Sequence, residues 1–314
     1  MMSGAVLRVG YQGVPGAYSE GAAVEFFGES GIEKVPCVSF GELLRRLNER
    51  EIDRAALPIE NSLAGTIHQN YDLLLKYNEL RIVGEIDFRV QHCLLVLPGV
   101  DRTQVKRAIS HPMALMQCVG YLARNSIVPE EAFDTAGSAQ MLRTSNITDA
   151  AAIASRRAAV AYGLDVLEEG IEDQQENYTR FFILARKDEN GSDGAPDASA
   201  TPRIPLDASR PCKTSVAFTL TNSPGALFKA LSVFVALDID LTKIESRHVA
   251  TLLEAQLGNS AEESRVTKLR WEYIFYLDFL GSAVEDGVSN ALHNLARISP
   301  FYRLLGSYYA HRSG

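Results

Sequence analysis

The segment NYTRFF places the hydroxyl of Thr179 beside the guanidinium of Arg180, where a predicted strand begins. Arginine can grip a carboxylate through two parallel hydrogen bonds, and a threonine hydroxyl can donate a neutral hydrogen bond within the same reach. The pair therefore suits a small organic acid. Because neighbours in an extended chain point to opposite faces, both can serve one ligand only if the strand is kinked at its start. A surface salt bridge explains the arginine equally well.

A glycine-rich segment, GYQGVPGAYS at residues 10–19, follows the first predicted strand and opens a helix. Free N–H groups at a helix start attract an anion. The glycines are spaced three and three, which differs from the dinucleotide fingerprint and argues against a nicotinamide cofactor. The alternative is a tight turn that needs glycine torsions.

A second polar segment, LPIENSLAGT at residues 57–66, ends another predicted strand and precedes another helix. Ligands bind at this end of the strands in open α/β sheets. Asn61 and Ser62 therefore either contact a ligand or cap the helix. The six histidines are scattered, so no motif supports Ser-His-Asp or Cys-His catalysis.

Strands and helices alternate through the first part of the chain, which predicts an α/β sheet with helices on both faces. This length could form two lobes around a cleft for a small ligand. The predicted strands lie at 7–11, 34–38, 53–60, 89–97, 106–110, 149–155 and 180–186. The predicted helices are Ser19–Phe27, Phe40–Leu47, Ile67–Lys76, His111–Asn125 and Arg156–Tyr162.

Residues 187–211 hold four of the twelve prolines and few large aliphatic residues, which predicts a linker. The part after it shows the order β-α-β-β-α-β, an α+β module whose first helix Ser223 should cap and Pro224 should begin. Residues 249–270 predict a solvated insert. The expected domains are therefore 5–187, a linker at 188–211, and 212–312.

Charge, apolar runs and cysteine spacing argue against three classes of function: nucleic-acid binding, membrane insertion and metal binding. The net charge of −8 lacks the basic excess that nucleic acid requires. The longest apolar runs, such as Cys93–Leu97, are too short to cross a membrane. Four cysteines without a CxxC pair predict reduced, mostly buried thiols and no metal. The amino terminus shows no targeting segment, so we expect a cytoplasmic protein unless a leader has been removed.

Several segments together resemble the prephenate dehydratase family, and within it the plant-type arogenate dehydratases. They include GYQGVPGAYS, LPIENSLAGTIHQNYDLL, HCLLVLPGV, ISHPMALMQC, DTAGSAQML, AAIASRRAAVAYGL, NYTRF, GALF and LTKIESR. The segments are collinear and span nearly the whole chain. The resemblance implies an α/β catalytic region of two lobes, similar to a type II periplasmic binding protein. A C-terminal ACT domain that senses phenylalanine would follow.

The implied reaction converts arogenate to phenylalanine, or prephenate to phenylpyruvate, by loss of water and carbon dioxide without a cofactor. The resemblance makes Thr179 the catalytic residue, and we assign it a hydrogen bond to the leaving hydroxyl. Arg180 would bind a carboxylate and Phe181 would shape the pocket wall. The other implied substrate-binding residues are Ser19, Asn61, Ser62, Thr135 and Ala136. Glu60 could be a general acid, a structural partner or an acceptor for an ammonium group.

The resemblance also implies a phenylalanine site in the second part of the chain. Its effector-binding residues would be Asn222, Pro224, Gly225, Ala226, Leu227, Glu245, Ser246 and Arg247. His248 stands where the family usually has proline, which leaves the rigidity of the effector loop open. Effector sites of this type lie between paired ACT modules, so a homodimer or homotetramer is implied.

Arogenate and prephenate differ at one carbon, which bears an ammonium in one and a keto oxygen in the other. We favour arogenate because the segments are more similar to plant-type members. The alternatives are a strict prephenate dehydratase and a non-catalytic amino-acid sensor. Plant-type members are generally plastid proteins, so a plastid stroma location applies if a transit peptide has been removed.

Overall fold

A computed structural model describes residues 6–187, 211–248 and 273–311. The predicted linker, apart from its two end residues, and the predicted insert at 249–270 lie outside these residues. Packing divides the chain into two units. Unit 1 consists of Met1–Ile67 and Ile86–Phe182, and unit 2 of His68–Glu85 and Ile183–Gly314. The expected domain boundaries stay a prediction.

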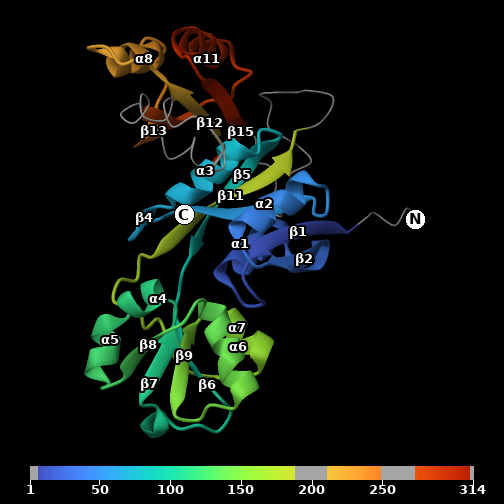
Figure 1. The fold of residues 1–314 in the computed structure, drawn as a ribbon, viewed down its shortest axis with the longest axis vertical. Helices are drawn as coiled ribbons and strands as arrows, with labels where there is room; N and C mark the ends of the chain where they lie inside the picture. Colours follow the sequence, from blue (N-terminus) through green and yellow to red (C-terminus); the bar gives the residue numbers. More distant parts are fainter. Residues whose placement is uncertain (1–5, 188–210, 249–272, 312–314) are drawn as a thin grey trace, which may run out of the picture. The chain divides into compact units, whose positions relative to one another are not determined.

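The first sheet has the strand order β2-β1-β3-β11-β5, and β4 pairs with β3 (Figure 1). Its strands are β1 (Leu7–Gln12), β2 (Ile32–Cys37), β3 (Arg54–Asn61), β4 (Gly65–Thr66), β5 (Leu80–Arg89) and β11 (Tyr178–Arg186). Helices α1 (Tyr18–Phe27) and α2 (Phe40–Asn48) and the 3-10 turn η1 (Glu29–Gly31) connect the first three. Strand β1 pairs in parallel with both β2 and β3, as alternating strands and helices predict.

Strands β5 and β11 each extend from unit 2 into unit 1. The sequence pattern placed a strand at 89–97 and missed β5, because Glu85 and Asp87 interrupt its apolar pattern. Both charges are paired inside the fold: Glu85 with Lys213 at 2.8 Å and Asp87 with Arg180 at 2.8 Å. Such pairing allows charged side chains to occupy a strand that packs within the fold.

The second sheet lies in unit 1 and has the order β10-β6-β9-β7-β8. Its strands are β6 (Cys93–Val96), β7 (Arg107–Ser110), β8 (Val128–Glu131), β9 (Ala150–Ala154) and β10 (Asp165–Glu169). Its helices are α4 (Pro112–Met116), α5 (Val119–Arg124), α6 (Thr135–Ser145) and α7 (Arg156–Tyr162), with a 3-10 turn η2 (Arg102–Gln104). The single helix expected at His111–Asn125 is thus two helices, separated at Gln117 and Cys118.

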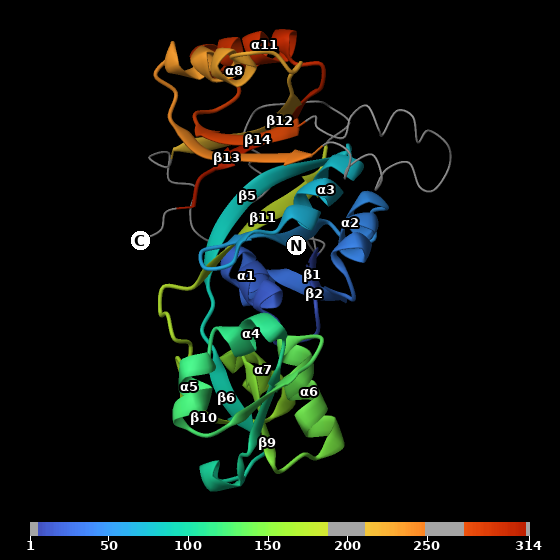
Figure 2. The ribbon, with the colours of Figure 1, turned by 60° about the vertical axis from the view of Figure 1, so that its left-hand side comes forward.

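Alternate residues of the second sheet face different helices. Leu95 and Ala152 pack with α6 and α7, whereas Leu94 and Ile153 pack with α4 and α5. Figures 1 and 2 show these helix pairs on opposite faces of the sheet. Helices on both faces confirm the predicted α/β class and explain why β9 is apolar throughout.

The C-terminal module in unit 2 has the predicted order β-α-β-β-α-β. Its elements are β12 (Cys212–Thr219), α8 (Ala226–Val235), β13 (Leu241–His248), β14 (Tyr273–Leu280), α11 (Asp286–Ile298) and β15 (Tyr302–Tyr309). The strands form an antiparallel sheet in the order β13-β14-β12-β15. Helices α8 and α11 cover one face, and Phe234 and Leu295 are buried there (Figure 2).

The other face of this sheet packs on α3 (His68–Lys76) and on the first part of β5, all within unit 2. The rings of Tyr71 and Tyr276 lie 4.6 Å apart, and Lys213 forms its buried ion pair with Glu85. Unit 2 is therefore assembled from an internal segment of the chain as well as the C-terminal part.

The start of α8 differs from the prediction. Its N-cap is Gly225, with φ of 77°, so Ser223 is not the cap and Pro224 precedes the helix. A glycine in the left-handed region extends the loop by two residues before the helix begins.

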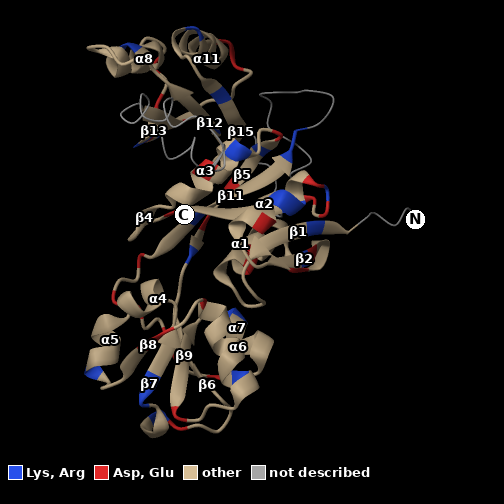
Figure 3. Ribbon diagram, viewed as in Figure 1, with Lys and Arg blue, Asp and Glu red and all other residues tan. Residues whose placement is uncertain are grey.

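Acidic and basic residues are interspersed over the helices and strands of each unit (Figure 3). On the second sheet, for example, Arg107 pairs with both Glu130 and Asp149. Three of the four cysteines are buried and Cys212 is partly exposed, as expected of unpaired thiols. Among the described residues, no helix combines the length and apolar character needed to cross a membrane.

Gly306 of β15 provides a test of the packing in unit 2. A Cβ at this position would overlap the backbone carbonyl of Ile82, which cannot move without displacing β5. We expect Gly306→Ala to lower the free energy of unfolding by about 2–4 kcal/mol in a denaturant titration. Gly287→Ala, where no atom lies within 4 Å, is the matched control and should change it by less than about 0.5 kcal/mol. Equal effects of the two substitutions would contradict this packing.

Candidate active site and effector pocket

Thr179 and Asn61 lie together at the ends of neighbouring strands. The amide Nδ2 of Asn61 donates to Oγ1 of Thr179 at 3.0 Å and lies 2.8 Å from Oδ1 of Asn177. Thr179 is 8% exposed and Asn177 is fully buried. Because Oγ1 of Thr179 accepts this bond, its own hydrogen remains to be donated to another group. The structure thereby brings the expected catalytic residue, Thr179, into contact with an expected substrate-binding residue, Asn61.

The hairpin between β3 and β4 sets the direction of Asn61. Its Oδ1 accepts hydrogen bonds from the backbone N–H groups of Leu63 at 3.0 Å and Ala64 at 2.9 Å. The amide nitrogen must therefore face Thr179. The alternative that Asn61 and Ser62 cap a helix is wrong, because a hairpin follows them and α3 begins only at His68.

Ser62 holds the start of β11. Its backbone N–H donates to the carbonyl of Tyr178 at 2.8 Å, and its Oγ accepts from the N–H of Tyr178 at 3.0 Å. Its hydroxyl also donates to the carbonyl of Glu176 at 3.1 Å. These bonds fix the backbone next to Thr179, so Ser62 acts here on the position of the strand. Its contact with substrate stays a prediction.

Arg180 is held by two carboxylates of neighbouring strands. Its Nε and Nη2 donate to Asp87 at 2.8 and 3.3 Å, and its Nη1 lies 3.6 Å from Glu60. The contacts of Arg180 are thus distinct from those of Thr179, as strand alternation predicts. The structure does not bring this hydroxyl and this guanidinium to one contact, so a substrate carboxylate would have to share Arg180 with Asp87.

Phe181 is buried, 2% exposed, and its ring meets that of Phe88 edge to face with centroids 6.4 Å apart. Phe88 in turn lies 6.5 Å from the ring of Tyr18. These aromatic residues form a fixed apolar layer next to Thr179 along β11. The layer fits a role for Phe181 in shaping a pocket wall.

The glycine-rich loop before α1 is a tight turn. Gly13 and Gly16 have φ of 112° and 90°, and a Cβ on Gly16 would overlap the backbone of Ala158. The N–H of Gly16 donates to the carboxylate of Glu20 at 2.6 Å. The chain's own carboxylate therefore takes one of the N–H groups expected to attract an anion. Ser19, in the first turn of α1, is 8% exposed.

Thr135 and Ala136 occupy the first turn of α6. The side chain of Asp134 caps this helix by accepting from the N–H of Gly137 at 2.7 Å. The methyl group of Ala136 lies in the core next to the second sheet, so any contact with substrate would use its backbone. Thr135 is partly exposed. Contacts of both residues with substrate stay predictions.

Three residues that the sequence patterns missed connect to Asn61. Asn177 donates from Nδ2 to Oε1 of Gln117 at 3.1 Å, and this oxygen lies 2.8 Å from Nε2 of His92. His92 is 2% exposed, and burial lowers its pKa. A lone histidine or glutamine in an apolar segment carries no periodic signal. The sequence could have indicated these three residues in one way only. His92, Gln117 and Asn177 lie in HCLLVLPGV, ISHPMALMQC and NYTRF, three of the segments that resemble the family.

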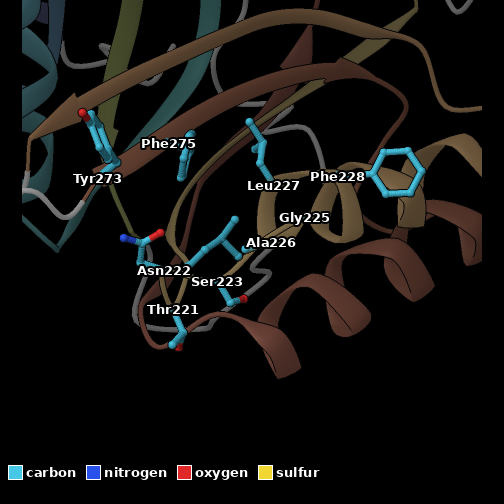
Figure 4. Close-up of a pocket in the computed structure, with 10 residues that line it drawn as sticks. Thr221, Asn222, Ser223, Gly225, Ala226, Leu227, Phe228, Tyr273 and Phe275 are labelled. Atoms are coloured by element: carbon cyan, nitrogen blue, oxygen red, sulfur yellow. The ribbon is translucent and has the colours of Figure 1, made fainter.

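A pocket of about 260 Å³ lies in the C-terminal module, between the loop before α8 and strand β14 (Figure 4). Its lining residues are Leu220, Thr221, Asn222, Ser223, Gly225, Ala226, Leu227, Phe228, Tyr273 and Phe275. Four of the predicted effector residues line it: Asn222, Gly225, Ala226 and Leu227. Polar groups at one end and aromatic rings at the other suit an amino acid with an apolar side chain.

The remaining predicted effector residues do not line this pocket. Glu245 contacts His68 at 3.2 Å, and Arg247 pairs with Asp72 at 2.8 Å, so both face α3. Ser246 pairs in register with Phe275 and is on the pocket side of β13. Pro224 does not line the pocket.

His248 occupies the position where proline was expected. Its ring lies 4.6 Å from the ring of Tyr273, a lining residue of the pocket. A proline there would lack both this ring contact and a backbone N–H.

Comparison with known proteins identifies the family. The prephenate dehydratase family model matches residues 9–189. An arogenate dehydratase/prephenate dehydratase of Arabidopsis thaliana is 43% identical over 307 residues, covering 98% of this chain and 74% of the relative.

Two solved structures match nearly the whole chain, each with a TM-score of 0.79. One is described as a novel type of quorum quenching acylase, with 30% identity and coverage of 97% of this chain and 98% of that one. The other is prephenate dehydratase in complex with L-Phe from Arthrobacter aurescens, with 29% identity and coverage of 96% and 90%. With the match to the Arabidopsis relative and to the family model, these findings show that the chain belongs to the prephenate dehydratase family.

Proposed function

We propose that this protein converts arogenate to phenylalanine by removing water and carbon dioxide, and that prephenate is a second substrate. As a member of the prephenate dehydratase family it is an enzyme, a carbon–oxygen lyase of phenylalanine biosynthesis. The observation that carries the proposal for the site is the bond from Asn61 to Thr179, which leaves the hydroxyl hydrogen of Thr179 available to substrate.

The chemistry needs few protein groups. As the bond from the ring to its carboxylate breaks, the electron pair moves into the ring, and the ring becomes aromatic as the bond to the hydroxyl breaks. The hydroxyl departs as hydroxide, which takes up a proton from solvent to become water. A positioned hydrogen-bond donor stabilises the negative charge that develops on this oxygen, and in this proposal Thr179 is that donor.

The environment of Thr179 favours dehydration over acyl transfer. A hydroxyl nucleophile needs a neighbouring base to remove its proton. The polar side chain that contacts Thr179 is the amide of Asn61, which cannot act as a base. A donated hydrogen bond uses the same hydroxyl without deprotonating it.

An acidic group near the substrate would favour arogenate. Glu60 lies 3.6 Å from Arg180, a longer contact than that of Asp87 with the same arginine. A carboxylate held at this distance can accept the ammonium group of arogenate, which prephenate lacks. Of the three interpretations of Glu60, this supports the acceptor for an ammonium group.

A substrate assay tests the proposed function. With purified protein, chromatography should detect phenylalanine from arogenate, and ultraviolet absorbance should detect phenylpyruvate from prephenate. We expect kcat/KM for arogenate to exceed that for prephenate by about 10-fold, since a hydrogen bond to a charged group is worth about 1.5–3 kcal/mol and about 1.4 kcal/mol is tenfold. A higher value for prephenate would contradict the preference, and no product from either would favour the sensor.

Substitution of Thr179 tests its role. Removal of one positioned donor costs about 3–4 kcal/mol, so Thr179→Ala should lower kcat by at least about 100-fold. Thr179→Ser keeps the hydroxyl and should retain most of the activity. The thermal unfolding midpoints of both variants should stay near that of the parent, because the side chain is small. A wild-type rate in folded Thr179→Ala would refute the assignment.

We propose residues 212–312 as the ACT domain, 5–187 as the catalytic domain and 188–211 as the linker. Phenylalanine would bind in the pocket beside α8 and lower activity. Apolar side chains of the same module are exposed, including Phe228 at 77% and Val235 at 70% on α8. A second copy covering them would place the pocket at an interface, which supports a homodimer or homotetramer.

A phenylalanine titration tests the pocket. Asn222→Ala removes a polar lining group and should raise the phenylalanine concentration for half-maximal inhibition by about 10-fold, the value of one good hydrogen bond. Activity without phenylalanine should be unchanged. The matched control is Asn290→Ala, an exposed position on α11 away from the pocket lining. Unchanged kinetics of the parent at saturating phenylalanine would count against a regulatory module.

The Arabidopsis relative is described as chloroplastic. It supports a plastid location, which we propose for this protein.

A further inference from the structure

A continuous chain of hydrogen bonds runs from Thr179 into the interior of unit 1 and reaches His92. We propose that His92 is a positioning residue of the dehydratase, which orients the hydroxyl of Thr179 through Gln117, Asn177 and Asn61. This inference rests on the proposed role of Thr179. Each of the four bonds in the chain spans 2.8–3.1 Å.

The direction of the chain is set at its outer end. Asn61 accepts two backbone N–H groups on Oδ1, so its amide nitrogen faces both Thr179 and Asn177. Asn177 must then turn Oδ1 toward Asn61 and Nδ2 toward Gln117. Gln117 receives this bond on Oε1. No amide along the chain can flip without breaking two bonds.

The tautomer of His92 follows from this direction. Oε1 of Gln117 is an acceptor and lies 2.8 Å from Nε2 of His92, so Nε2 must carry a hydrogen. Nδ1 lies 2.7 Å from the hydroxyl of Tyr18, which donates to it when the ring is neutral. The carbonyl of Gln91 lies 3.0 Å from the same hydroxyl and competes for its hydrogen.

The surroundings of His92 favour the neutral ring. The side chain is 2% exposed. One oxygen of the Glu172 carboxylate accepts the backbone N–H of His92 at 2.9 Å, and its negative charge raises the pKa of the ring by less than burial lowers it. Burial lowers the pKa of His92 and is the largest influence on it. The chain requires a hydrogen on Nε2, and the neutral ring carries its single hydrogen there.

The consequence for catalysis is specific. Without the donor at Nε2, Oε1 of Gln117 loses one of its two partners, so Gln117 and Asn177 are held less firmly behind Asn61. The bond from Asn61 to Thr179 then loosens, and the hydroxyl of Thr179 is no longer held in one orientation toward substrate. Loss of His92 should lower kcat with little change in KM, because the residues that bind the carboxylates lie outside the chain.

A set of His92 variants tests the proposal. His92→Leu should lower kcat about 10-fold or more with KM within about 2-fold. His92→Gln places an amide nitrogen near the position of Nε2 and should recover most of the loss. The matched control is His293→Leu at an exposed position on α11, which should behave as the parent. Equal loss in His92→Leu and His92→Gln would overturn the proposal.

A double-mutant cycle separates positioning from general damage to the fold. In a Thr179→Ala background, His92→Leu should change the residual kcat less than about 2-fold, because the hydroxyl through which it acts is gone. An undiminished 10-fold effect there would overturn the inference and leave the role of Thr179 intact. Full activity of Thr179→Ala itself would instead refute the proposed function.

15N NMR of the full protein measures the protonation of the His92 ring independently of activity. It therefore tests the proposal even if His92→Leu does not fold. The 15N shifts of His92, assigned by comparison with His92→Gln, should show a neutral ring protonated on Nε2. A neutral ring protonated on Nδ1 would contradict the hydrogen-bond direction.

Discussion

The hydrogen bond from Asn61 to Thr179 is the interaction on which the site depends. It joins residues 118 positions apart in the sequence, and it exists because β3 and β11 are neighbours in one sheet. The hairpin after β3 supplies the backbone donors that turn the amide of Asn61 toward Thr179. The chemistry of one hydroxyl is therefore set by sheet order and by one turn.

The same sheet separates the polar groups of the site by function. Thr179 belongs to a network of neutral amides, whereas the adjacent Arg180 belongs to an ionic cluster with Asp87 and Glu60. In the proposed function, the neutral donors serve the leaving hydroxyl and the charged groups serve the ends of the substrate. Strand alternation keeps the two sets of contacts apart although the residues are consecutive.

The C-terminal sheet of unit 2 also places different kinds of side chain on its two faces. One face buries apolar residues under α8 and α11, and the other holds the ion pair of Lys213 with Glu85 against β5. The expected effector residues of β13 are divided by this arrangement, since Glu245 and Arg247 face α3 and Ser246 shares a side with Phe275. A motif of consecutive residues in a strand therefore contributes to two different surfaces.

The sequence by itself determined the α/β class, the β-α-β-β-α-β module and most strands, because apolar periodicity reports which side chains must be buried. Motif resemblance added the family and the candidate residues Thr179 and Asn61. Tertiary structure alone decided that residues 80–89 form the strand β5, since Glu85 and Asp87 break the pattern and are paired only in the fold. It alone connected His92, Gln117 and Asn177 to the site, because hydrogen bonds between residues distant in sequence leave no local pattern.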